Sequence, residues 1–157
     1  SNEISWRESL AEVVEIPLDV DGGIDLDVLR RALSDPAHAG RPRIGSFSAA
    51  SNVTGLITDT RAIARLLHAH GAWACFDFAA AAPYVDIDMR IGQPEGYDAI
   101  FISPHKFVGG PGTPGVLVVR RQLLTNAKLP GMKRYSVVCQ MCLFDSQVFG
   151  WRSGSHM

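Results

Sequence analysis

Short, nearly continuous apolar segments alternate with amphipathic segments through most of this 157-residue chain. One of the apolar segments is "AWACFDFA" (72–79). The segment before it, "TDTRAIARLLHAHG" (58–71), repeats its apolar residues at helical spacing, with Thr58 or Asp59 as the expected N-cap and Gly71 as the expected stop. Apolar strands that alternate with helices are typical of α/β proteins whose sheet is covered on both faces. The sequence therefore predicts an α/β fold with a mostly parallel sheet and flanking helices.

The other expected elements follow from the same two periodicities. Four further strands are predicted, at residues 12–18, 43–51, 98–103 and 115–121. A second helix is expected at 25–35, with Asp25 or Asp27 near its N-cap, and a third helix begins near residue 121. Residues 80–97 are expected to form a loop with room for one helical turn. After residue 126 neither a strand period nor a helix period is recognisable.

Composition and charge exclude several classes of protein. A net charge of −1 gives no basic field for nucleic acid, and no apolar segment approaches the roughly 20 residues of a membrane span. The first ten residues lack the pattern of a signal peptide. Three cysteines provide no disulfide framework, which favours a cytoplasmic protein, and we interpret Cys139 and Cys142 as unpaired thiols because one CxxC motif is only half of a zinc site.

Polar side chains follow three of the predicted strands. Asn52 comes after the strand at 43–51, Asp77 lies near the end of the next strand, and Ser103, His105 and Lys106 end the third. Each residue alone has a structural explanation, such as a turn for Asn52 or a helix cap for Asp77. If the strands are parallel neighbours, however, all five residues lie at one edge of the sheet, where α/β proteins bind their ligands.

The surroundings of Lys106 narrow the chemistry. A Walker phosphate loop places its lysine after the glycines, whereas "HKFVGGPGTPG" (105–115) places Lys106 before them. The glycines at 110, 112 and 115 have G-x-G-x-x-G spacing, but a predicted strand follows them where a dinucleotide-binding loop would open a helix. A nucleophile elbow is absent from the sequence. A loop lysine near a carboxylate fits an imine with pyridoxal phosphate, a cofactor that also needs an acid at its ring nitrogen and donors for its phosphate.

Four segments resemble the class V aminotransferase group of pyridoxal-phosphate enzymes, which includes the cysteine desulfurases. They are "SNEISWRE" (1–8), "SNVTGLITD" (51–59), "GAWACFDFAAAAPYVDID" (71–88) and "DAIFISPHKFVGGPGTPGVLVVRR" (98–121). The resemblance covers roughly residues 1–126, and it implies the large domain of a fold type I enzyme with pyridoxal 5′-phosphate as cofactor.

The resemblance also implies a role for each residue at the predicted edge. Lys106 corresponds to the Schiff-base lysine, which would also shuttle the substrate's Cα proton. Asp77 corresponds to the partner of the ring nitrogen, Ser103 and His105 to phosphate ligands, and Asn52 to the ligand of the ring 3-oxygen. The implied activity is transamination, desulfuration or a related elimination on an amino-acid substrate. Elements of the large domain that this chain lacks would leave apolar strand faces or edges uncovered, so we expect a homo-oligomer, such as a homodimer, or a complementing chain.

The sequence also departs from the family pattern. Ala80 stands where desulfurase-like members carry a glutamine. The ring-stacking histidine, the upstream phosphate loop and the C-terminal small domain of complete members have no counterpart in this chain. We therefore expect a truncated large domain at 1–126, an atypical tail at 127–153 and, in "GSHM" (154–157), residues typical of a cloning-vector remnant.

Two alternatives remain open. The chain could be a catalytically inactive fragment or scaffold that keeps the lysine segment without a complete pocket. It could also be an α/β module that binds a phosphorylated metabolite, with Lys106 acting as a point charge and forming no imine.

Overall fold

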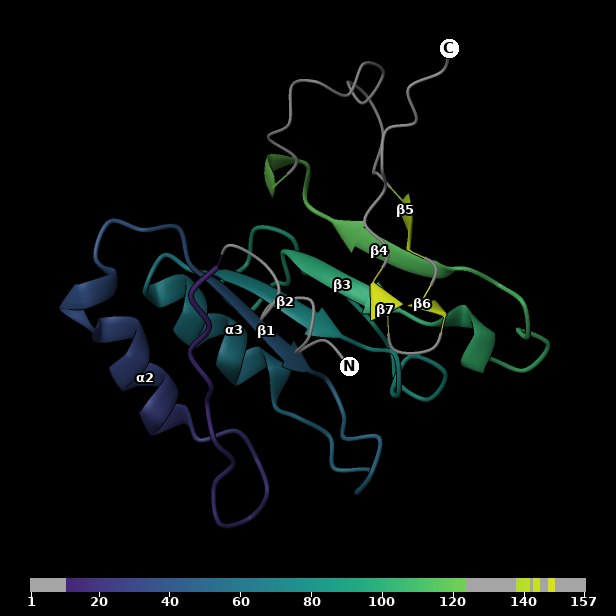
Figure 1. The fold of residues 1–157 in the computed structure, drawn as a ribbon, viewed down its shortest axis with the longest axis horizontal. Helices are drawn as coiled ribbons and strands as arrows, with labels where there is room; N and C mark the ends of the chain where they lie inside the picture. The colour runs from purple at the N-terminus through teal and green to yellow at the C-terminus, as the bar shows by residue number, and fades with distance from the viewer. Residues whose placement is uncertain (1–10, 124–137, 142, 145–146, 149–157) are drawn as a thin grey trace.

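A five-stranded mixed sheet forms the centre of the computed structural model, which describes residues 11–123 and the short strands at 138–141, 143–144 and 147–148 (Figure 1). The strands lie in chain order: β1 (Ile44–Ser48), β2 (Trp73–Asp77), β3 (Ala99–Ile102), β4 (Gly115–Val119) and β5 (Val138–Met141). β1, β2 and β3 pair in parallel, whereas β4 is antiparallel to both of its neighbours. Four of the five strands therefore point the same way, as expected for a mostly parallel sheet.

Smaller elements complete the described part of the chain. β6 (Leu143–Phe144) and β7 (Gln147–Val148) form a separate antiparallel pair. The α-helices are α2 (Leu26–Ser34) and α3 (Thr60–Ala69), and the short 3₁₀ helices are η1 (Pro36–His38), η2 (Pro104–Lys106) and η3 (Arg121–Leu123). None of the helices in these residues has the length and apolarity that crossing a lipid bilayer requires.

The N-caps of both α-helices are aspartates that the sequence analysis named as candidates. The side chain of Asp25 accepts hydrogen bonds from the amides of Asp27 and Val28, and that of Asp59 accepts one from the amide of Ala62. These carboxylates satisfy amides that have no partner within the helix. α3 ends before Gly71, whose φ of 68° is the left-handed conformation that glycine adopts easily. The predictions for both helices are confirmed.

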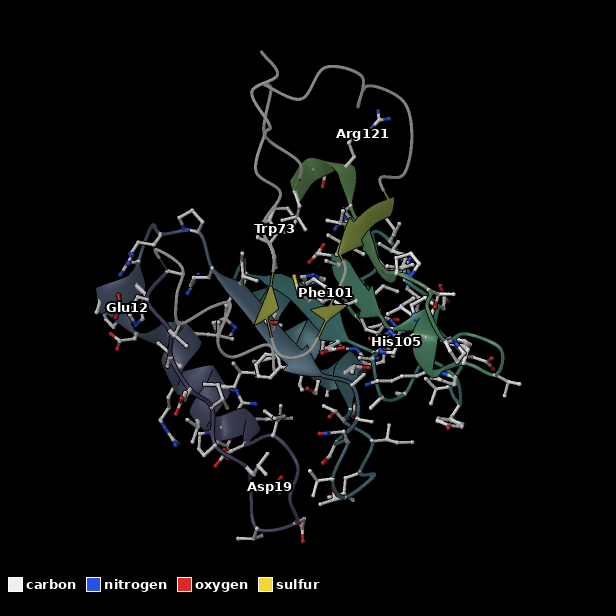
Figure 2. The ribbon with its side chains drawn as sticks, turned by 45° about the vertical axis from the view of Figure 1, so that its right-hand side comes forward. Glu12, Asp19, Trp73, Phe101, His105 and Arg121 are labelled. Atoms are coloured by element: carbon white, nitrogen blue, oxygen red, sulfur yellow. The ribbon has the colours of Figure 1, made fainter. Side chains whose placement is uncertain are left out.

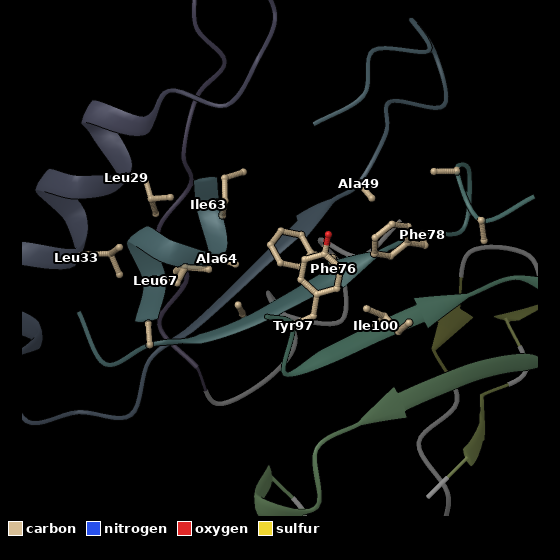
Figure 3. Packing of buried hydrophobic residues seen from close by; sticks show 14 residues of the cluster. Leu29, Leu33, Ala49, Ile63, Ala64, Leu67, Phe76, Phe78, Tyr97 and Ile100 are labelled. Carbon is tan, nitrogen blue, oxygen red and sulfur yellow. The ribbon is translucent and has the colours of Figure 1, made fainter. Parts of the chain in front are cut away.

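The hydrophobic core lies between one face of the sheet and the two α-helices. In Figure 3, Leu29 and Leu33 of α2 and Ile63 and Leu67 of α3 lie on the side of the sheet from which Phe76 projects. The side chains that form this core are all buried, and they include Leu29, Leu33, Ile63, Ala64, Leu67, Ala74, Phe76, Phe78, Tyr97 and Ile100. The Phe76 and Tyr97 rings meet at 4.8 Å between centroids, in a tilted arrangement that aromatic pairs favour.

Close contact between helix and sheet depends on Gly45 in β1. A Cβ atom at this position would lie 2.5 Å from both Leu67 methyl carbons, much closer than carbon atoms can approach. The missing side chain therefore allows α3 to pack directly on β1 and β2.

Several expectations for local structure need correction. The strand predicted at 12–18 is wrong, because this segment forms only an isolated bridge between Leu18 and Ile24. Its valines stay largely exposed, at 40% for Val13 and 49% for Val14. Because the segment buries little apolar surface, little free energy favours its addition to the sheet as a strand beside β1. Residues 80–97 form the predicted loop, and a single helical turn lies at its start, where the Ala82 amide donates to the Phe78 carbonyl at 2.7 Å. Near residue 121 the structure has only η3, and the rest of the expected third helix lies outside the described residues.

Candidate functional site

The carboxyl ends of β1, β2 and β3 meet at one edge of the sheet. Ser48 of β1 pairs in register with Asp77, and Asp77 pairs with Phe101 of β3. This arrangement confirms that the three predicted strands are parallel neighbours. It brings Asp77 and the segment from Ser103 to Lys106 onto adjacent strand ends.

Asp77 is held in place by the backbone around it. Its carboxylate oxygen Oδ1 accepts a hydrogen bond from the amide of Ala79 at 2.7 Å, and its carbonyl oxygen accepts one from the amide of Ala49 at 2.8 Å. The next amide, of Phe78, donates to the carbonyl of Phe101 at 2.8 Å, so all three strands are joined at this level. Asp77 is half-buried, and only turns follow it, so it does not cap a helix. Its carboxylate is thus fixed at the strand end.

The segment after β3 passes from the interior to the surface within four residues. Ser103 is buried with 3% of its surface exposed, His105 is half-buried and Lys106 is exposed (Figure 2 labels His105). The Ser103 carbonyl accepts a hydrogen bond from the Lys106 amide at 3.0 Å, but its hydroxyl forms no capping bond to η2. The hydroxyl of Ser103, the imidazole of His105 and the amine of Lys106 therefore follow one another along the chain at the carboxyl edge.

The glycine-rich loop after Lys106 folds back against η2. A Cβ atom on Gly110 would overlap the Pro104 carbonyl oxygen, so only glycine fits at this buried position. The Gly110 amide donates to the Phe107 carbonyl at 2.9 Å, and the Thr113 hydroxyl donates to the Gly110 carbonyl at 2.7 Å. The loop thus fixes the backbone that carries the lysine.

Asn52 lies at the exposed tip of the loop between β1 and α3. The Ser51 hydroxyl accepts hydrogen bonds from the amides of Val53 and Thr54, and the Ser51 amide donates to the Leu56 carbonyl at 2.9 Å. These bonds close the loop on itself. The structure therefore places Asn52 in a turn, farther along the chain from its strand end than Asp77 and Ser103 are from theirs.

A buried ionic cluster that the sequence analysis did not predict lies at the opposite, amino edge of the sheet. The side chain of Asp98, just before β3, is completely buried. Its Oδ1 accepts from the Arg120 guanidinium at 2.7 Å, while Oδ2 accepts from His68 Nε2 at 2.7 Å and from the Ala74 amide at 2.8 Å. Burial raises the pKa of Asp98, but the amide, the imidazole and the guanidinium together hold it below the usual value.

Metal and thiol chemistry have little support in the described part of the chain. No group of three or more histidine, cysteine, aspartate or glutamate side chains is placed there to hold a metal ion. Burial and then the charge of Asp98 raise the pKa of the Cys75 thiol to about 12, so this thiol stays protonated and unreactive. Cys142 lies outside the described residues, and the interpretation of Cys139 and Cys142 as free thiols stays a prediction.

Known proteins provide independent evidence about the family. The family model for class V aminotransferases matches residues 1–155. A cysteine desulfurase from Synechococcus elongatus is 34% identical over 153 residues, which make up 95% of this chain and 23% of that relative. A cysteine desulfurase from Klebsiella pneumoniae is 38% identical over 128 residues, or 79% of this chain and 29% of that relative. This chain therefore spans about a quarter of the length of these two relatives.

Solved structures agree with the sequence comparison. The cysteine desulfurase CsdA from Escherichia coli superimposes with a TM-score of 0.62 at 30% identity, over 78% of this chain and 28% of that structure. A NifS-like protein from Rickettsia africae gives a TM-score of 0.56 at 24% identity, over 65% of this chain and 27% of that structure, and supports the fold alone. The predicted fold, part of the large domain of fold type I, is confirmed. By sequence and by fold, the chain belongs to the class V aminotransferase family.

Proposed function

We propose that this chain is the cofactor-attachment part of a pyridoxal-phosphate enzyme that acts on an amino acid. The observation that carries the proposal is the carboxyl edge, where Asp77 ends β2 and the segment from Ser103 to Lys106 follows the neighbouring β3. Membership of the class V family supports the same cofactor. Because the chain spans about a quarter of its relatives, the activity belongs to a larger protein.

The side chains at this edge fit the chemical groups of pyridoxal phosphate. Lys106 offers an exposed amine for the aldehyde, and Asp77 offers a fixed carboxylate for the ring nitrogen. Ser103, whose hydroxyl does not cap η2, and His105 would hold the phosphate. Asn52 would bond the ring 3-oxygen from the loop after β1. When bound, the cofactor supplies an electron sink for charge that develops at the substrate's Cα.

The chain's own residues would perform two tasks in the reaction. Asp77 presents its carboxylate at the strand end, where it would stabilise a protonated ring nitrogen. The amine of Lys106 lies on a short, braced 3₁₀ turn, from which it would take the proton from the substrate's Cα and return it. The backbone bonds around Asp77 and Gly110 would keep both groups oriented, which is where the fold contributes to the rate.

The reaction that we favour is desulfuration of an amino acid. Matched relatives are cysteine desulfurases, which favours an amino-acid substrate that contains sulfur. Ala80 leaves a methyl group where the resemblance leads us to expect a glutamine, so transamination or a related elimination stays open. A cytoplasmic location agrees with a buried thiol in the described core.

Apolar side chains exposed at the carboxyl edge support a partner there. Val53, Ile57, Tyr84 and Val108 belong to the loops that follow β1, β2 and β3, and each is more than two-thirds exposed. Exposed apolar side chains gathered at one edge are typical of an interface. We propose that a second copy of this chain, or a complementing chain, covers this edge and completes the site.

Borohydride trapping tests the proposed cofactor attachment. With pyridoxal phosphate and borohydride present, we expect a phosphopyridoxyl group on the peptide that contains Lys106, and a visible absorption band before reduction. Lys128 and Lys133, the remaining lysines of the chain, serve as internal controls. Equal labelling of all three lysines would contradict the proposal and would favour an inactive scaffold.

A matched variant separates attachment from nonspecific amine chemistry. Lys106→Arg keeps the positive charge but cannot form the imine, so it should lose the absorption band and the label. If Lys106→Arg binds the cofactor as tightly as the unchanged chain, the residue acts only as a point charge, as a phosphometabolite-binding module would require.

A further inference from the structure

A pocket of about 580 Å³ lies at the amino edge of the sheet, away from the candidate functional site. Its wall includes Trp73 at the start of β2, the C-terminal end of α3, the turn at 92–94 and the cluster of Asp98, His68 and Arg120. In Figure 2, Trp73 and His105 lie at different ends of the sheet. This volume is within the range of small-molecule sites, roughly 300–1,000 Å³.

The buried cluster holds Arg120 in place at this pocket. His68 Nδ1 lies 2.8 Å from the Pro94 carbonyl oxygen, while Nε2 lies 2.7 Å from Asp98. The completely buried carboxylate of Asp98 also accepts a hydrogen bond from the Arg120 guanidinium at 2.7 Å. The cluster therefore fixes the orientation of the Arg120 guanidinium beside the pocket.

Several hydrogen-bond donors around the pocket remain unused. Arg120 donates one N–H group to Asp98, and its other N–H groups have no hydrogen-bond acceptor among residues 11–123. The Gln93 backbone amide donates to the Arg90 carbonyl at 3.0 Å, but the Gln93 side chain and the Trp73 indole N–H have no hydrogen-bond partner in that range. Arg65 is 57% exposed, and its nearest carboxylate, Glu95, is 3.9 Å away.

Negative groups near the pocket are already neutralised. At the end of α3, the Leu67 carbonyl accepts from the amides of His70 and Ala72, and the Leu66 carbonyl accepts from His70 Nδ1. Glu95 forms a closer ion pair, 3.1 Å, with Arg90. The usual negative potential of a helix C-terminus is therefore reduced, and the cations dominate.

We propose that this pocket binds a small organic anion through a carboxylate or phosphate group. Arg120 and Arg65 bind the anionic oxygens, and the Trp73 indole and the alanines at the end of α3 contact the apolar part of the ligand. Guanidinium groups suit this role because their planar N–H donors match two oxygens at once.

Amide and indole NMR spectra of the 157-residue chain provide the test. Inorganic phosphate and succinate are titrated separately at constant ionic strength, with Trp73→Phe used to assign the indole signal. We expect a saturable shift of the Trp73 signal with at least one anion, and the better of the two identifies the preferred group. A chloride titration that gives the same shift would overturn the proposal, because it would show general screening alone.

Matched variants locate the anion. Arg65→Gln removes an exposed charge whose ion pair with Glu95 is long, at 3.9 Å, and it should weaken binding about tenfold. Arg121→Gln removes an exposed charge next to Arg120 but outside the pocket, and it should leave the affinity unchanged. Ser103→Ala, at the proposed cofactor site, should also leave the Trp73 shift unchanged. If Arg65→Gln binds as tightly as the unchanged chain, or if Ser103→Ala abolishes the shift, the proposal is wrong.

Discussion

The buried carboxylate of Asp98 stays ionised because the groups around it replace water. Asp98→Asn would leave Arg120 without its counter-charge and His68 without its carboxylate partner, and each of these side chains is only 22% exposed. We expect a loss of about 3 kcal/mol in the free energy of unfolding, near the low end for a broken buried pair because both partners of Asp98 reach solvent. Urea unfolding measures it. Asp88→Asn, at a carboxylate that is 70% exposed, is the control and should change stability much less. Equal effects of the two variants would contradict this account.

Stability should also fall in acid because of the same residue. The pKa of Asp98 in the folded chain lies below its value in the unfolded chain, which is about 3.9. Ionised Asp98 therefore stabilises the fold fully at pH values above the pKa of the unfolded chain. This stabilisation is lost as the pH falls through the lower pKa of the folded chain. Urea midpoints measured from pH 6 down to about pH 3 should decrease, and Asp98→Asn should show a shallower decrease. Parallel curves for the two proteins would assign the acid sensitivity to other carboxylates.

Residue patterns predicted one edge of the sheet much better than the other. Asp77 and the segment from Ser103 to Lys106 could be predicted because each follows an apolar strand and parallel strands end together. Asp98 was missed because its partners His68 and Arg120 lie 30 and 22 residues away and share no local pattern with it. Such a cluster exists only once the fold has brought three elements together.

The contact between α3 and β1 limits which residue can stand at position 45. Gly45→Ala should reduce the free energy of unfolding by about 1–3 kcal/mol, because the new methyl group would overlap the Leu67 side chain. Thermal or urea unfolding measures the loss. In a Leu67→Ala background the same substitution should cost much less, since the space for the methyl group is then available. Additive effects of the two substitutions would show that Gly45 is needed for another reason.

Local signals decided which elements could be predicted. Both α-helices carry an aspartate cap and a regular apolar stripe, so their ends were predicted to within about one residue. The apolar segment at 12–18 gives a strand signal too, but strand formation depends on a neighbour, and within residues 11–123 β1 pairs with β2 alone. For β4 the sequence predicted a strand, but its antiparallel direction depends on how the loop at 103–114 turns.

At the scale of the whole molecule, the two edges of the sheet carry different chemical groups. The carboxyl edge carries the carboxylate of Asp77 and the amine of Lys106, and it is surrounded by exposed apolar loops. The amino edge carries a cationic pocket on a buried ionic cluster. In the function that we propose, the carboxyl edge is the side that a second chain would cover, because the cofactor-binding residues and the exposed apolar loops lie there together.

Association through the carboxyl edge is the prediction at this scale. Val108 is fully exposed in the loop after Lys106, and Ile57 is 71% exposed in the loop after β1. If these side chains are buried between copies, each exposed apolar residue favours association by roughly 1.5–3 kcal/mol. Sedimentation velocity at micromolar concentration should show a dimer or larger species, and Val108→Asp should shift it towards monomer because a buried charge without a partner is costly.

Ile91→Asp, at a residue that is 64% exposed in the turn near the amino edge, is the control and should leave the distribution unchanged. A monomeric wild-type chain with a cooperative melt would show that the exposed side chains at this edge do not drive self-association.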